Sequence, residues 1–314
     1  YSGDGGAATS AQLNHPRAAY VDTAGNIYIS DRSNARIRKV DTNGIITTFA
    51  GTGESGYSGD GGAATSAKIT WSYQLTMDSQ GSLYFADSDN HIIRKIDTNG
   101  IITTIAGTPE SNGDSGDGGA ATSAKLNGPL GVAFDTGGNL YIGDYYNETI
   151  RKVDTSGNIS TVAGTGTRGY SGDGGLATSA TLFYPSVLTL DKSGNIYFCD
   201  SGNEVIRKIW TSGIITTIAG TGVEGYSAPS TGTEAHLYAP YGVVLDSLNN
   251  LYITDSWNYL IRKLDASYHT LTGTPTNSDV GTTTMTLTAS DGQGGSATQS
   301  FALKVINTND APVL

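Results

Sequence analysis

The 314-residue sequence is poor in the residues that mark several common protein classes. It has one cysteine and four histidines, which excludes a framework of intrachain disulfides and argues against a histidine-built metal centre. It has no run of 18 apolar residues, so we expect no transmembrane helix in this segment. Lysine and arginine total 18 against 29 aspartates and glutamates, and the net charge of −11 argues against nucleic acid or an anionic membrane as a partner.

Turn-forming and β-forming residues are abundant instead. The sequence holds 43 glycines and 18 tyrosines, while charged residues make up only 15% and hydrophobic residues 37%. This composition is too apolar for a disordered chain and too rich in turn residues for a helical bundle. We therefore expect an all-β fold.

An internal repeat organises most of the chain. The segment SGDGGAATSA stands at 2–11, 58–67 and 115–124, and SGDGGLATSA stands at 171–180. Its aspartates recur at spacings of 56, 57 and 56 residues, as Asp4, Asp60, Asp117 and Asp173. A second aspartate closes an apolar-Tyr-apolar segment in each unit, as Asp31, Asp87, Asp144, Asp200 and Asp255. Five units are thus present, and such a fixed period indicates a solenoid or a propeller.

Each unit contains the pattern of four short strands. In the first unit we expect strands at 18–21, 27–30, 36–40 and 45–50, because polar turn segments rich in Gly, Asn and Asp separate these runs. Four antiparallel strands per unit predict a β-propeller blade, which must pack against neighbouring blades to bury both of its faces.

The repeated motifs resemble those of NHL-repeat β-propellers. They are GDGG-x-ATSA, G-N-L-Y-I-x-D, N-x-x-I-R-K and G-I-I-T-T-x-A-G-T-G, and the resemblance covers residues 1–265. It implies four-stranded blades, five of them visible and part of a six-bladed ring, in units at about 1–56, 57–114, 115–169, 170–225 and 226–265. It also implies an extracellular or cell-surface location.

Residues 266–314 carry a different pattern. The segments TLTGTPTNSDVG, TLTASDG and NTNDAP resemble the C-terminal half of a cadherin-like or dystroglycan-type Ig-like module, which implies a partial β-sandwich. Asp291 and the pair Asn309-Asp310 are similar to calcium-ligating residues between cadherin modules, and a solvated turn and linker is the alternative.

The GDGG loops are the first candidate site. Calcium takes six to eight oxygen ligands, and four loops offer one carboxylate each, so calcium is the one cofactor that the sequence suggests, with Asp4, Asp60, Asp117 and Asp173 as ligands. Because each loop has a single aspartate, we favour a structural role in which glycines adopt positive φ and the aspartate caps the turn. On that basis Gly61→Val should destabilise the fold more than Asp60→Asn.

Aromatic residues that differ between units are the second candidate site. A ligand-binding or carbohydrate-binding platform is one interpretation and packing is the other for Trp71, Tyr73, Tyr145, Tyr146, Tyr184, Tyr241 and Trp257. Arg-Lys pairs recur in every unit, at 38–39, 94–95, 151–152, 207–208 and 262–263. Because a binding site usually differs between loops, we expect these pairs to bind the recurring aspartates rather than to form a cationic ring.

No catalytic group emerges from the sequence. Cys199 lies in a strand pattern without a histidine base, and the histidines occupy unlike positions in their units. The leading hypothesis is a non-catalytic extracellular or cell-surface binding or adhesion scaffold, whose rim loops present a surface to a protein or carbohydrate ligand. The alternative is a propeller enzyme with a channel metal, of the lactonase or lyase type, for which we can assign no residues.

Overall fold

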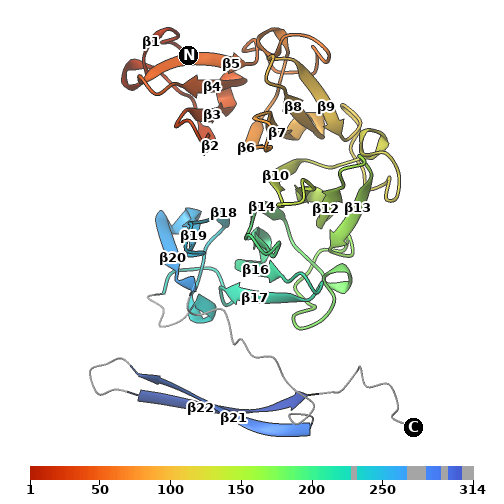
Figure 1. The fold of residues 1–314 in the computed structure, drawn as a ribbon, viewed down its shortest axis with the longest axis vertical. Coiled ribbons are helices and arrows are strands. Elements are labelled where there is room, and N and C mark those ends of the chain that lie inside the picture. The colour runs from red at the N-terminus through yellow and green to blue at the C-terminus, as the bar shows by residue number, and fades with distance from the viewer. Residues whose placement is uncertain (228–231, 267–280, 291–295, 306–314) are drawn as a thin grey trace. The chain divides into compact units, whose positions relative to one another are not determined.

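The computed structural model describes residues 1–227, 232–266, 281–290 and 296–305. The chain divides into two compact units, Tyr1–Tyr268 and His269–Leu314. The first unit is built of five antiparallel sheets that follow one another along the chain, each with one strand toward the centre of the unit (Figure 1). The all-β β-propeller predicted from the sequence is confirmed.

Three of the blades have four described strands in sequence order. The second blade contains β6 (Ser72–Met77), β7 (Leu83–Asp87), β8 (Ile92–Ile96) and β9 (Ile102–Ala106). The third contains β10 (Pro129–Phe134), β11 (Leu140–Asp144), β12 (Thr149–Val153) and β13 (Ile159–Ala163). The fourth contains β14 (Pro185–Leu190), β15 (Ile196–Asp200), β16 (Val205–Ile209) and β17 (Ile215–Ala219).

The first and fifth blades differ from the four-stranded prediction. The first has five strands, β1 (Gly6–Ala7), β2 (Pro16–Val21), β3 (Ile27–Asp31), β4 (Arg36–Val40) and β5 (Ile45–Ala50). The fifth has three described strands, β18 (Pro240–Leu245), β19 (Leu251–Asp255) and β20 (Leu260–Leu264). The fifth blade lacks a fourth strand in the described residues because the β-branched segment that forms this strand in the other units does not return after Leu264.

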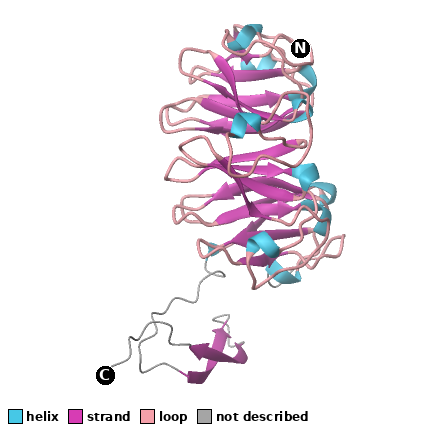
Figure 2. Cartoon of the chain, turned by 90° about the vertical axis from the view of Figure 1, so that its right-hand side faces the viewer, coloured by secondary structure: helices cyan, strands magenta, loops and turns pink. Residues whose placement is uncertain are grey.

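Helical structure is confined to short turns, visible between the strands in Figure 2. Ten 3₁₀ turns of three residues are described: η1 (Ala8–Ser10), η2 (Arg32–Asn34), η3 (Ala64–Ser66), η4 (Ser88–Asn90), η5 (Ala121–Ser123), η6 (Tyr145–Asn147), η7 (Ala177–Ser179), η8 (Ser201–Asn203), η9 (Gly232–Glu234) and η10 (Ser256–Asn258). The second unit contains an antiparallel pair, β21 (Gly281–Ser290) and β22 (Ser296–Val305). Asp291 and Asn309-Asp310 lie outside the described residues.

The glycine-rich segment of each of the first four units covers the outer edge of its own blade. In the first blade β1 pairs with β5 through Gly6 and Ile46. Equivalent bridges join Ala63 to Ile101, Ala120 to Asn158 and Leu176 to Ile214. An exposed edge strand is a template for pairing with other chains, so this arrangement closes the outer edge of four blades.

Apolar residues at equivalent repeat positions fill the space between blades. Ile37, Ile93, Ile150 and Ile206 on the third strands are fully buried, with 0% of their surface exposed. Their counterpart in the fifth blade, Ile261, is 68% exposed. The outer face of the fifth blade is therefore uncovered within the described residues, although its sequence pattern is that of a packed face.

Candidate functional site: an aromatic collar at one rim

A buried aspartate at the end of each second strand builds the rim. In the second blade, Asp87 accepts hydrogen bonds from the backbone N–H of Thr70 at 2.8 Å and from the side-chain amide of Asn90 at 2.9 Å. Asp31, Asp144, Asp200 and Asp255 make the same two contacts in their own blades. We call β2, β6, β10, β14 and β18 the inner strands. Each aspartate thus ties the segment before the inner strand of its blade to the 3₁₀ turn after the second main strand.

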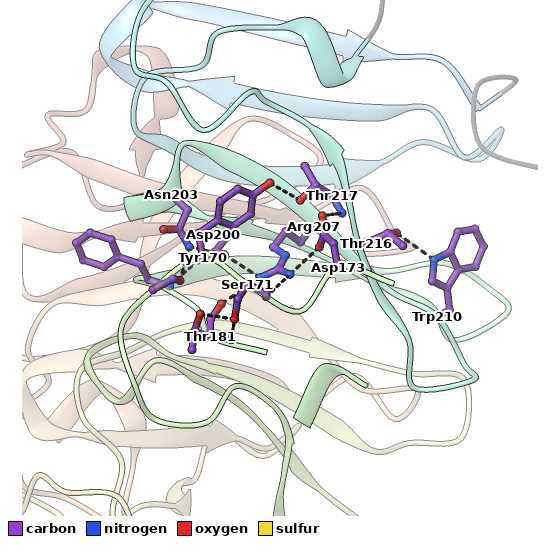
Figure 3. Close-up of polar contacts among 12 residues, drawn as sticks. Tyr170, Ser171, Asp173, Thr181, Asp200, Asn203, Arg207, Trp210, Thr216 and Thr217 are labelled. Atoms are coloured by element: carbon purple, nitrogen blue, oxygen red, sulfur yellow. Dashed lines mark hydrogen bonds and ion pairs between the residues drawn. The ribbon is translucent and has the colours of Figure 1, made fainter. Parts of the chain in front are cut away.

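A buried arginine beneath this rim links two aspartates, as Figure 3 shows for Arg207. Its Nη2 lies 2.6 Å from Oδ1 of Asp173 and its Nη1 lies 3.4 Å from Oδ2 of Asp200. Oδ2 of Asp173 also accepts the N–H of Thr217 at 2.9 Å, and the Tyr170 ring lies 5.4 Å from the guanidinium. We call this arrangement the arginine bracket.

The bracket recurs in the other units and confirms the predicted partners of the repeated arginines. Arg38 pairs with Asp4 and Asp31, Arg94 with Asp60 and Asp87, Arg151 with Asp117 and Asp144, and Arg262 with Asp255 alone. The lysines of the Arg-Lys pairs depart from the prediction. Among the described residues, Lys95 and Lys263 alone of these lysines form ion pairs with carboxylates, whereas Lys208 lies over the Tyr197 ring, 4.8 Å from its centre.

The surroundings of the loop aspartates fit calcium poorly. Asp4, Asp60, Asp117 and Asp173 each face a guanidinium, and their second oxygens accept hydrogen bonds from the chain. A positive group within ion-pair distance opposes a cation at the same carboxylate, and one carboxylate leaves most of the six to eight oxygen ligands unsupplied. In the described parts of the chain, no three His, Cys, Asp or Glu side chains gather as a metal-binding group.

The positive φ expected of the loop glycine is confirmed, whereas the loop aspartate has a different role from the expected turn cap. Gly61 has a φ of +81°, which strains any side chain placed there, although an added Cβ meets no atom within 4 Å. At Gly59, with a φ of +90°, an added Cβ would lie 2.7 Å from the Cα of Ala67. Asp60 meanwhile neutralises the buried Arg94, so Asp60→Asn is not the silent change expected from a turn cap.

The variable aromatic residues gather at this rim, where the scaffold positions are constant. Tyr145 and Tyr184 are stacked, with ring centres 4.6 Å apart and planes 8° apart, and Tyr146 packs edge-on against both. The rings of Tyr73 and Tyr241 lie 6.2 Å apart. We call these five tyrosines together with Trp71 the aromatic collar. Trp257 instead packs on Tyr238 at 4.9 Å and makes no ring contact with the collar in the described structure.

Three arginines that the sequence analysis missed lie against the collar. The guanidinium of Arg32 lies 3.5 Å from the centre of the Trp71 ring, that of Arg17 lies 6.0 Å from Tyr241, and that of Arg168 lies 4.5 Å from Tyr184. Arg17 stands at the repeat position that Tyr73 and Tyr241 occupy in other units. Variation of this position between units could have identified Arg17 from the sequence, because such variation marks charged residues as well as aromatic ones.

Residues with positive φ after the 3₁₀ turns join neighbouring blades beneath the collar. Glu148, with a φ of 56°, accepts the backbone N–H of Tyr184 and forms an ion pair with Arg168 at 3.2 Å. His91 accepts the N–H of Gly128 at 3.0 Å, and Glu204 accepts that of Ala239 at 2.5 Å. These contacts fix the start of the inner strands and hence the orientation of the collar.

A cavity of about 620 Å³ lies between the inner strands and is lined in part by Arg17, Tyr73 and Tyr241. Gln74 donates to the carbonyl of Leu188 at 2.8 Å and accepts the N–H of Val132 at 2.9 Å, so it bridges three blades at the cavity wall. Burial raises the pKa of Tyr145 and of Tyr241. The hydroxyl groups of Tyr145 and Tyr241 are therefore neutral donors at physiological pH.

Comparison with known proteins identifies the repeat. The family model of the teneurin NHL domain matches residues 1–56, 52–114, 107–171 and 165–233. The chain belongs to the teneurin NHL domain family. A second model, a putative Ig domain, matches residues 211–306. The NHL-repeat and Ig-like resemblances seen in the sequence are thereby confirmed.

Teneurins of vertebrates are similar over most of the propeller. Mouse teneurin-1 is 33% identical over 233 residues, and mouse teneurin-4 is 35% identical over 231 residues. These matches cover 67% and 66% of this chain but only 8% of each teneurin. The chain thus spans a small part of the length of these curated relatives.

Solved structures share the fold at low sequence identity. An auxiliary nutrient binding protein from Bacteroides thetaiotaomicron has a TM-score of 0.60 at 19% identity, covering 81% of this chain and 59% of that one. A streptogramin B lyase has a TM-score of 0.51 at 17% identity, covering 82% and 70%. No helix in the described residues is long and apolar enough to cross a membrane.

Proposed function

We propose that the propeller is a non-catalytic binding scaffold of the extracellular space or the cell surface, and that the aromatic collar holds its ligand. The single observation that carries the proposal is the contrast between constant and variable positions at one rim. Asp and Asn contacts repeat in every blade, whereas the side chains they support change to tyrosine, tryptophan or arginine. Such placement of varied side chains on a repeated rigid frame is typical of binding surfaces.

Two further features support the proposal. Membership of the teneurin NHL domain family favours a cell-surface setting and a protein or carbohydrate partner. Several collar rings are also accessible, because 56% of Tyr146 and 43% of Trp71 are exposed. Large aromatic side chains with polar groups at their edges are the residues that most often anchor ligands at interfaces.

Replacement of collar residues tests the proposal. Wild-type protein and the variants Trp71→Ala and Tyr146→Ala would be applied to arrays of extracellular protein domains and of glycans. The matched control is Trp210→Ala, because β16 runs away from the collar and ends next to Trp210. Ligands of the wild type should be lost by both collar variants and kept by the control. Ligands that bind all variants equally would refute the collar as the binding site.

The alternative of a propeller enzyme with a channel metal is supported by likeness of fold alone. A lactone-hydrolysis assay of the same protein with added divalent metal checks it. Metal-dependent turnover that persists in Trp71→Ala and Tyr146→Ala, alongside an absence of array ligands, would favour an enzyme over the scaffold.

A further inference from the structure

Two arginines have no polar partner among the residues that the structure describes. The sequence contains nine arginines, and seven donate hydrogen bonds to the chain: Arg36, Arg38, Arg94, Arg151, Arg168, Arg207 and Arg262. Arg17 and Arg32 form neither a hydrogen bond nor an ion pair with any described residue, and the buried Nε of Arg32 has no acceptor. Both belong to the first blade and both lie against the collar.

Rings of the aromatic collar hold both guanidinium groups at the same rim. Arg32 lies over Trp71 at 3.5 Å and over Tyr73 at 5.5 Å, while Arg17 lies 6.0 Å from Tyr241, the ring partner of Tyr73. A guanidinium stacked on a ring keeps its in-plane N–H donors free, and their planar arrangement matches the two oxygens of a carboxylate.

No carboxylate in the described residues forms an ion pair with either of these two arginines. Asp89 is near enough to interact with Arg32, but it forms no ion pair with it, and burial raises the pKa of Asp89 while Arg32 lowers it. Glu148 is already bound to Arg168 and to the N–H of Tyr184. At physiological ionic strength charges are screened over about 8 Å, so the net −11 of the chain counts less at this rim than Arg17 and Arg32 do.

The adjoining cavity favours a small ligand with many hydroxyl groups. Its volume of about 620 Å³ lies in the range of small-molecule sites. Besides the collar tyrosines, its lining includes four hydroxyl-bearing residues, Tyr20, Thr76, Thr189 and Ser256. Hydroxyl groups both donate and accept, and aromatic faces cover the apolar side of a ring.

We infer that the collar binds a carboxylated sugar, a uronate or sialate residue of a glycan, whose carboxylate is held by Arg17 and Arg32 and whose ring lies against Trp71 and Tyr73. This inference rests on the proposed function, since it names the ligand class of the same site. The aromatic faces and cavity supply affinity for the sugar, and the two arginines discriminate the acidic form from its neutral parent.

The test compares acidic and neutral sugars on matched variants. Calorimetric titration would use a glucuronate-terminated and a sialate-terminated trisaccharide, each beside the neutral oligosaccharide that lacks the acidic residue. We expect Arg17→Gln and Arg32→Gln each to weaken binding of the acidic sugar about tenfold, equal to about 1.4 kcal/mol. Lys192→Gln, which removes an exposed charge in the turn at the far end of β14, should leave binding unchanged. Arg32→Lys should not restore affinity if the contact is bidentate.

The outcomes separate the inference from the proposed function. Tighter binding of either the glucuronate-terminated or the sialate-terminated trisaccharide than of its neutral parent supports the inference, and the tighter of the two identifies the acidic sugar. Equal affinity for acidic and neutral sugars, with no effect of Arg17→Gln or Arg32→Gln, overturns it but leaves the collar as a sugar site. Binding of an acidic peptide that depends on Trp71 and Tyr146, with no binding of any sugar, also overturns it. Array ligands that bind the Trp71→Ala and Tyr146→Ala variants as well as the wild type overturn the proposed function itself. Circular dichroism of each variant verifies folding.

Discussion

The arginine bracket makes a quantitative prediction for Asp173→Asn. The change keeps the size of the side chain and one acceptor oxygen, but it removes one of the two negative charges beside Arg207. That guanidinium is fully buried and would be left with Asp200, 3.4 Å away, as its only carboxylate. The N–H of Thr217 and the guanidinium would also compete for the single remaining oxygen.

The size of the effect follows from these contacts. A hydrogen bond to a charged group contributes about 1.5–3 kcal/mol to stability, and partial exposure reduces this contribution. Because the Asp173 side chain is 42% exposed, we expect a loss of about 1–2 kcal/mol. For a chain of this size that loss lowers the melting temperature by roughly 2–6 °C.

Thermal unfolding followed by circular dichroism measures the shift. Asp265→Asn is the matched control, since Asp265 pairs with Lys263 at 2.5 Å but both side chains are about half exposed, and its melting temperature should equal that of the wild type. Millimolar calcium should change neither protein. Equal melting temperatures for Asp173→Asn and Asp265→Asn, or a calcium-induced rise that Asp173→Asn abolishes, would refute the bracket as the role of this aspartate.

Three further predictions follow from the repeat. Glu224→Arg should stabilise the fold by at most about 1 kcal/mol and so raise the melting temperature, because the new guanidinium would face Glu204 as Arg168 faces Glu148. A lower melting temperature would contradict this. Ile206→Ala should cost about 2–4 kcal/mol in denaturant unfolding, whereas Ile261→Ala at the equivalent position should cost well under half of that; equal costs would show that the fifth face is covered. Stability should also be lost below about pH 4. Burial raises the pKa of Asp117, but the hydrogen bonds from Arg151 and Thr161 and the charge of Arg151 lower it by more, so the folded-state pKa lies below the ordinary value for an aspartate. The ionised Asp117 therefore stabilises the fold above that ordinary value, and this stabilisation disappears as the pH falls and Asp117 is protonated; an unchanged melting temperature at about pH 3 would contradict this.

The repeated part of the fold was predictable because the strand patterns and the turn residues of each unit indicate the same four-stranded arrangement. Strands expected at 27–30, 36–40 and 45–50 are found at Ile27–Asp31, Arg36–Val40 and Ile45–Ala50. Asp22 shows why: its carboxylate accepts the N–H groups of Ala24 and Asn26, so the turn between the first two main strands is encoded locally. Five copies of such a turn leave little choice of register.

Contacts between distant positions were less accessible from the sequence. The pairing of Arg94 with both Asp60 and Asp87 joins a loop to two strands, 34 and 7 residues away. Repetition indicated that these charges meet, but it could not show that the guanidinium is fully buried. That burial turns the loop aspartate from a turn cap into a counter-charge and changes the expected cost of its removal.

The candidate site could be anticipated only where residues break the repeat. Six of the seven aromatic residues chosen for their variation belong to the collar, and Trp257 does not. A symmetric frame presents each blade's variable side chains at the same height, so departures from the consensus meet in space even when they are far apart in the chain. Arg17 and Tyr241 meet in this way although 224 residues separate them in the chain. In a propeller, the positions to compare between units are therefore those beside the constant Asp and Asn, whatever the chemistry of the side chains found there.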